Sequence, residues 1–177
     1  MRQARKNVQA VGAAGSYVSG MGEGRTAMSE NERIVEQLKQ VHEGEAWHGP
    51  SVCEAIDGVD ATGAASRPIR AAHSIWEIVH HVRVTDEGVR AHLTGQPTAE
   101  EPDWPTLDDT GDSAWRTAVA KLKDSQRALR DAVARLPEAR LHDAVPGKSH
   151  SYWYELLGLM HHDLYHAGQI ALLKRAL

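Results

Sequence analysis

Residues 161–176 read HHDLYHAGQIALLKRA and belong to the last helix that is expected in the chain. From about residue 151 to 175, apolar residues occur on nearly all sides of the helical wheel, as expected of a central, buried helix. Within it, His162 and His166 are four residues apart, which is about 40° of rotation and one helical turn, so both imidazoles can reach one metal ion. His161 is rotated by about 100° and lies off this stripe. The spacing alone is equally compatible with histidines that are only hydrogen bonded.

Three further segments show the pattern of long amphipathic helices. Two of them begin at capping boxes, SENE at residues 29–32 and SIWE at residues 74–77. The long helices are expected at residues 30–43, 74–94 and 113–136, and a short helix that begins at Pro50 is expected at 50–57. The apolar seam of the third long helix has one polar break, at Gln126. Four long helices joined by polar loops predict an all-α protein with the fold of a four-helix bundle.

The first 28 residues differ in composition from the rest. They lack helical periodicity and are rich in Gly, Ala and Ser, so residues 1–28 are expected to form a disordered N-terminal extension. The bundle domain is then expected to comprise residues 29–177. Met28 directly precedes the first capping box and is a second candidate for the natural start.

Composition restricts the classes of function. A chain of 177 residues is expected to form one domain that folds without disulfides. Its net charge of -4 provides no basic surface, so no nucleic-acid partner is expected. No run of about 18 apolar residues occurs, so no membrane partner is expected either. Cys53 is the single cysteine, which gives no indication of an oxidising compartment and leaves the cytoplasm as the expected location.

A metal site with an open position for chemistry needs a third protein ligand. On the second long helix, His81 lies at the edge of the apolar arc, whereas His80 points roughly opposite and is expected to meet solvent. His81 can therefore face the bundle interior and join His162 and His166. Three imidazoles suit Zn²⁺ best, and Ni²⁺, Co²⁺ and Fe²⁺ also accept them.

The segments AWHGPSVCEAIDGV, HSIWEIVHHV, DWP and HHDLYHAGQIALLKRA resemble the DinB-like superfamily of metal-binding four-helix proteins. The likeness extends over roughly residues 29–177, and YHAGQI is its most specific part. The resemblance implies one metal ligand on the second helix and two on the last, which map onto His81, His162 and His166. Some relatives are thiol-dependent enzymes, such as bacillithiol S-transferases and mycothiol-dependent maleylpyruvate isomerase, whereas most members have no assigned reaction.

Three functions fit these observations, and the first is a metal-dependent thiol S-transferase. Its partners would be a small-molecule thiol and a small electrophile, and a homodimer is a further expectation. The second is a hydrolase that uses metal-bound water, because His162-Asp163-x-x-His166 resembles the zinc-protease pattern with Asp in place of Glu. The third is a non-enzymatic metal-binding or stress-associated protein.

Other residues are assigned supporting roles, and none is assigned as catalytic. His48 is a candidate for lining the pocket, and Gln169 is a candidate for a hydrogen bond to a ligand histidine. Cys53, which has apolar neighbours, is interpreted as a buried, inert thiol. The acidic loop from Glu100 to Asp112 is interpreted as a solvated connection.

Overall fold

A computed structural model describes residues 27–177, and its regular structure is entirely helical. The elements are α1 (Glu30–Glu43), α2 (Val52–Ile56), α3 (Ala61–Ala65), α4 (Ile75–Thr94), α5 (Asp112–Arg135), the 3₁₀ helix η1 (Glu138–Arg140) and α6 (Tyr152–Arg175). Within the described residues, β pairing is limited to one isolated bridge between Ala144 and Ser151. The prediction of an all-α protein is confirmed. The expected disorder of residues 1–28 falls almost entirely outside the described residues.

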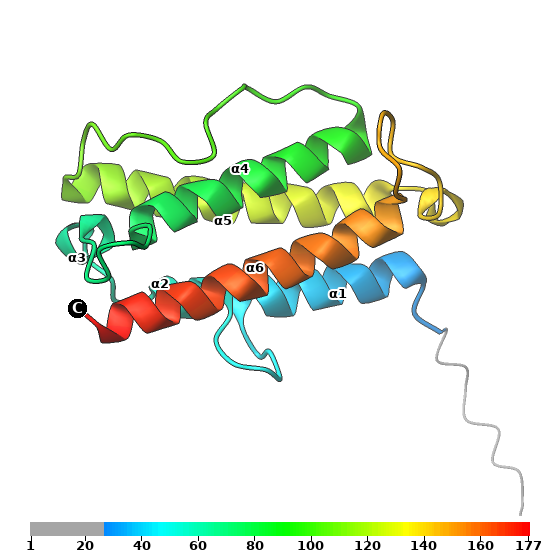
Figure 1. The fold of residues 1–177 in the computed structure, drawn as a ribbon. Helices are drawn as coiled ribbons and strands as arrows, with labels where there is room; N and C mark the ends of the chain where they lie inside the picture. Colours follow the sequence, from blue (N-terminus) through cyan, green and yellow to red (C-terminus); the bar gives the residue numbers. More distant parts are fainter. Residues whose placement is uncertain (1–26) are drawn as a thin grey trace, which may run out of the picture.

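The four long helices α1, α4, α5 and α6 pack side by side as a bundle (Figure 1). Helices α4 and α5 run in one direction, and α1 and α6 run in the opposite direction (Figure 1). Because α4 and α5 are parallel, the connection between them must return along the bundle, and residues 95–111 run back over α4 (Figure 1). This long crossover therefore lies against the outer side of α4.

The helix starts are set by side-chain caps. The capping boxes predicted at Ser29 and Ser74 are both present and begin α1 and α4. The short helix α2 begins two residues later than predicted, because Ser51 caps it by accepting a hydrogen bond from the Glu54 amide at 3.2 Å. Helix α3 was not predicted at all. Asp60 caps it through the Gly63 amide at 2.7 Å, in a segment whose glycine and alanines give little helical periodicity.

Helix α6 is less buried than the sequence predicts. Its side chains Tyr154, Tyr165 and Leu172 are 63%, 65% and 58% exposed, so one face of the helix meets solvent. His161 is exposed on the same helix. The sequence of α6 lacks a marked polar stripe, but the helix is not buried on all sides.

A polar layer divides the core of the bundle into two apolar clusters. Along α6, for example, Met160 belongs to one cluster, Ala167 belongs to the other, and the fully buried Asp163 lies between them. The four long helices contribute one buried polar residue each to this layer: His42, Asp86, Gln126 and Asp163. His42 and Asp163 are hydrogen bonded to each other across the layer, and a buried pair of this kind constrains the register of α1 against α6.

None of the described helices combines the length and the apolar character that a membrane span requires.

Candidate metal centre

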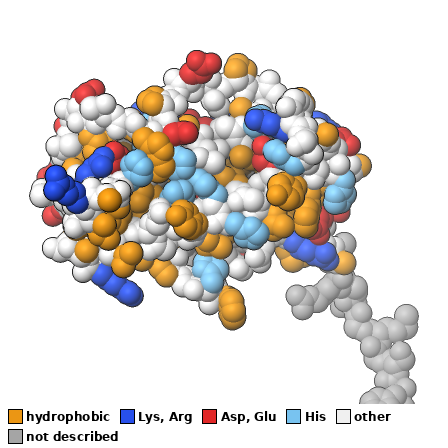
Figure 2. Space-filling model, viewed as in Figure 1, with side chains coloured by type: hydrophobic (Ala, Val, Ile, Leu, Met, Phe, Trp, Pro, Cys, Tyr) orange, Lys and Arg blue, Asp and Glu red, His pale blue; other side chains and the backbone are white. Residues whose placement is uncertain are grey.

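The three histidines singled out from the sequence come together between α4 and α6. Nε2 of His81 lies 2.9 Å from Nε2 of His162. The ring of His166 is centred 4.9 Å from that of His81 and 4.4 Å from that of His162. One potential ligand atom from each residue lies within 4.8 Å of the other two. Histidine side chains gather on this face of the molecule, over α4 and α6 (Figure 2).

Hydrogen bonds on the outer nitrogens orient the two rings of α6. Nδ1 of His162 lies 3.1 Å from Oδ1 of Asp163, and Nδ1 of His166 lies 2.8 Å from Oε1 of Gln169. An imidazole that donates from Nδ1 keeps a lone pair on Nε2. Both rings therefore offer a bare nitrogen to the space shared with His81, in the arrangement common for metal-binding histidines.

The electrostatics of the site keep two of the rings uncharged. Burial, followed by the neighbouring His162 and His166, lowers the pKa of His81 to about 4. Burial, followed by His162, also lowers the pKa of His166. Neutral imidazoles at neutral pH are ready to act as ligands.

The donor set fits a divalent transition-metal ion. Two imidazole nitrogens that approach as closely as those of His81 and His162 need either a shared proton or a shared cation between them. Nδ1 of His81 is buried and has no hydrogen-bond partner, so no protein group on that side draws the ring away. Three nitrogen donors from rigid helices leave room for a fourth, exogenous ligand.

The crossover loop passes over this centre. Residues 100–112 are mostly exposed, as a solvated connection should be, but Trp104 also contacts the site, which the sequence did not predict. Trp104 stacks on His81, with ring centroids 4.2 Å apart, and on His73, with centroids 3.6 Å apart. His80 does not face open solvent as expected, because its Nε2 lies 3.0 Å from the carbonyl oxygen of Pro102. An ion pair between Arg83 and Glu101 fixes the same loop.

His48 and Gln169 have different positions relative to the site. Gln169 contacts His166, as described above. His48 is exposed in the segment between α1 and α2, and no hydrogen bond joins it to the three histidines.

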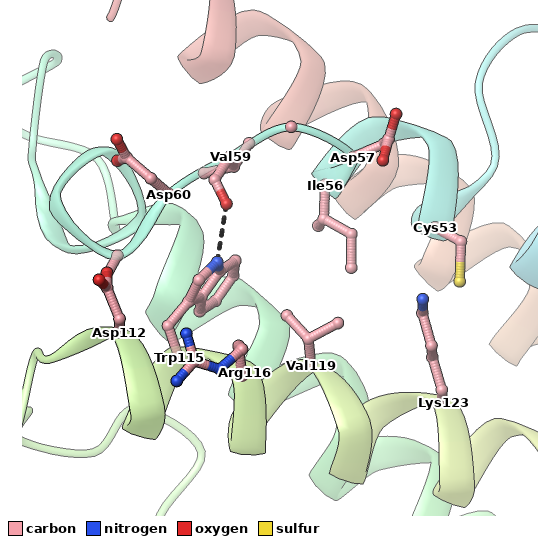
Figure 3. A pocket seen from close by; sticks show the side chains of 12 residues that line it. Cys53, Ile56, Asp57, Val59, Asp60, Asp112, Trp115, Arg116, Val119 and Lys123 are labelled. Carbon is pink, nitrogen blue, oxygen red and sulfur yellow. Dashed lines mark hydrogen bonds between the residues drawn. The ribbon is translucent and has the colours of Figure 1, made fainter.

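Cys53 lines a separate cavity of about 400 Å³ between α2, α3 and α5, with Trp115 and Lys123 among its other walls (Figure 3). None of the three histidines borders this cavity. Burial raises the pKa of the Cys53 thiol and outweighs the opposing effect of Lys123. A thiol of raised pKa is a weak nucleophile at neutral pH, which agrees with the interpretation of Cys53 as inert.

Sequence reasoning did not assign roles to several residues that the structure places at or behind the centre. His73 and Trp104 lie within the segments HSIWEIVHHV and DWP, so the resemblance offered a signal for both. His42 and Arg130 are 88 positions apart and meet through a hydrogen bond of 3.0 Å. No local pattern reports a contact of that kind, since it depends on the packing of α1 against α5.

Comparison with known families gives one match. The family model of the DinB superfamily matches residues 51–170, which is more than half of the chain. The match includes all three histidines and leaves α1, with His42, outside. No curated protein and no solved structure matches the chain.

Proposed function

We propose that this chain, which belongs to the DinB superfamily, binds one divalent metal ion and activates a small-molecule thiol for transfer to an electrophile. The ligands in this proposal are His81, His162 and His166. The observation that carries it is the convergence of three imidazoles, two of which have their outer nitrogens hydrogen bonded. Zn²⁺ is the preferred ion for three imidazoles with one open position, and Ni²⁺, Co²⁺ and Fe²⁺ satisfy the same donor set.

When bound, the ion would stabilise the thiolate form of a small thiol at neutral pH. The protein would then orient the nucleophile and restrict the access of water. Asp163 and Gln169 hold two of the rings in place, and Trp104 covers the third. In the transfer, sulfur forms a bond to the electrophilic carbon, the leaving group departs with its bonding electrons, and the thiol proton passes to a base. His73, which is stacked on Trp104 and partly exposed, is the base that we assign to that proton.

The proposal is tested by metal analysis of protein prepared without a histidine tag and by calorimetry with L-cysteine as the probe thiol. We expect close to one equivalent of metal per chain and thiol binding to the metal-loaded form alone. Equal thiol affinity in the loaded and metal-free forms would rule out the transferase mechanism.

The two alternatives differ in the support they receive. A hydrolase would need Asp163 as the general base, but this side chain is fully buried and both of its oxygens are hydrogen bonded to histidines. A non-enzymatic metal-binding protein is supported by the cover that Trp104 gives to His81. Product formation from a thiol and a chromogenic aryl halide separates this alternative from the transferase.

A further inference from the structure

Asp163 connects the candidate metal centre to the polar layer of the core. Its Oδ1 lies 3.1 Å from Nδ1 of His162, and its Oδ2 lies 3.1 Å from Nε2 of His42. Nδ1 of His42 lies in turn 3.0 Å from NH1 of Arg130, which also pairs with Glu43 near the surface. A continuous chain of polar contacts thus runs from α5 through α1 to α6.

The direction of each hydrogen bond in this chain follows from its first member. A guanidinium group donates and cannot accept, so Nδ1 of His42 must accept from Arg130. The proton of His42 is then on Nε2 and is donated to Asp163. Each oxygen of the fully buried Asp163 thus faces one imidazole nitrogen, Nδ1 of His162 on one side and Nε2 of His42 on the other.

The ionised carboxylate of Asp163 accepts on both of its oxygens. It therefore receives the Nδ1 proton of His162 and leaves Nε2 of that ring bare.

We propose that Asp163 is a positioning residue that fixes the proton of His162 on Nδ1, and that Arg130, by holding the proton of His42 on Nε2, determines which way a polar group at position 163 must face. The role concerns the metal centre and thus rests on the proposed function. The match to the DinB superfamily covers residues 51–170, so it includes Asp163 and Arg130 and leaves His42 outside.

A second metal site in the polar layer is the competing explanation, because His42, Asp86 and Asp163 offer ligand atoms within 4.8 Å of one another. However, Nε2 of His42 carries a proton in this arrangement, and both oxygens of Asp163 are occupied by histidine donors. A hydrogen-bonded network accounts for the same residues and needs no ion beside the guanidinium of Arg130.

The test is a double-mutant cycle with Asp163→Asn and Arg130→Gln. An asparagine has one accepting and one donating end. While Arg130 keeps the proton of His42 on Nε2, the amide oxygen at position 163 must face His42, and the amide NH₂ must face His162. Nδ1 of His162 then has to accept a hydrogen bond, so the ring proton moves to Nε2, the nitrogen that would bind the ion. We expect Asp163→Asn to weaken Zn²⁺ binding by about 10- to 100-fold.

Arg130→Gln should weaken Zn²⁺ binding little, because the carboxylate of Asp163 still accepts from both histidines. In the double variant, the glutamine can accept from His42, which can shift its proton to Nδ1 and let the asparagine turn its oxygen toward His162. We expect the second substitution to restore Zn²⁺ affinity by about tenfold relative to Asp163→Asn alone. Competition with a chromophoric chelator measures the affinities, and Asp124→Asn on the exposed face of α5 is the matched control.

Nitrogen NMR of the imidazole rings in the metal-free protein reads the protonated nitrogen directly. We expect Nδ1–H at His162 and Nε2–H at His42 in the wild type, and Nε2–H at His162 in Asp163→Asn. Additive affinity losses in the cycle, or Nε2–H at His162 in the wild type, would overturn the proposal. A wild-type protein that binds no Zn²⁺ would refute the metal centre, whereas the protonated nitrogen of His162 in the wild type would still decide the role of Asp163, even if a variant failed to fold.

Discussion

His81 and His162 each have a neighbouring histidine in the sequence, and only one member of each pair faces the shared site. His162 contacts His81, whereas His161 is exposed. His80 is directed to the carbonyl of Pro102 instead. The helical wheel separates both pairs correctly, because the rotation of about 100° per residue is a property of the backbone. It does not show that His80 binds a loop, because that contact spans 22 positions.

Alanine substitution of single histidines tests the ligand set. His81→Ala, His162→Ala and His166→Ala should each lower Zn²⁺ affinity by at least about tenfold, since even the loss of an outer hydrogen bond has an effect of about 10- to 100-fold. His161→Ala is the matched control, because its exposed ring is expected to leave affinity and stability within about 0.5 kcal/mol of the wild type. Metal stoichiometry after dialysis is the measurement. A metal-free His161→Ala protein beside a loaded His162→Ala protein would contradict the assignment.

Asp86 gives a prediction about pH at the scale of one residue. Burial, followed by the charge of Asp163 and a hydrogen bond to it, raises its pKa well above the usual value, so the folded protein keeps a proton that the unfolded chain releases. The folded state therefore loses relative stability as the pH rises above about 4. Asp86→Asn, which can also donate to Asp163, removes this dependence.

The stability gain of Asp86→Asn should be small near pH 4 and larger near pH 7. Urea unfolding at the two pH values measures the difference. A gain that shrinks as the pH rises would show that Asp86 is ionised in the fold.

At the scale of elements, the long helices could be predicted because their signals are local. Capping boxes and apolar spacing depend on residues three or four positions apart, and the structure confirms α1 and α4 at the predicted ends. The crossover loop could not be interpreted in this way. Its prolines and acids are typical of a solvated connection, but the parallel arrangement of α4 and α5 forces it to return over α4, where Trp104 meets His81.

Replacing Trp104 tests whether the crossover loop limits access to the metal. Aromatic pairs contribute about 0.5–1.5 kcal/mol each, so losing the stacks on His73 and His81 should speed the extraction of Zn²⁺ by a chelator by about tenfold. Trp47→Ala is the matched control, because that side chain is 97% exposed. Stopped-flow absorbance of the chelator gives the rates. Equal rates for Trp104→Ala and the wild type would mean that metal leaves by another route.

At the scale of the whole molecule, the apolar core should hold the fold whether or not the three histidines bind a metal ion. Two apolar clusters, one on each side of the polar layer, supply the core. The polar layer was visible in the sequence only as the break at Gln126, since its other members look like ordinary helix residues until the helices are packed. A bundle with this core should remain folded without metal.

Removal of the metal should therefore lower stability without unfolding the bundle. Saturating Zn²⁺ adds about 2.7 kcal/mol at a free concentration of about one hundred times Kd, so the metal-free protein should keep its helical circular dichroism and melt at a lower temperature.

Acid should act on the same residues. The pKa of His81 is lowered to about 4, and that of His166 is also lowered, whereas an unfolded histidine titrates near about 6.5.

As the pH falls from about 6.5 toward about 4, the unfolded chain binds protons that these folded rings reject, so the metal-free protein should lose stability over that range. Above about pH 6.5 both states are neutral at these positions, and the contribution vanishes. His81→Ala should flatten this pH dependence in the metal-free protein, and His161→Ala should not. The measurement is the melting temperature of the three metal-free proteins across this pH range. Parallel curves for His81→Ala and the wild type would mean that His81 is protonated in the folded protein. A protonated ring cannot bind a metal ion, so that result would contradict the assignment of His81 as a ligand.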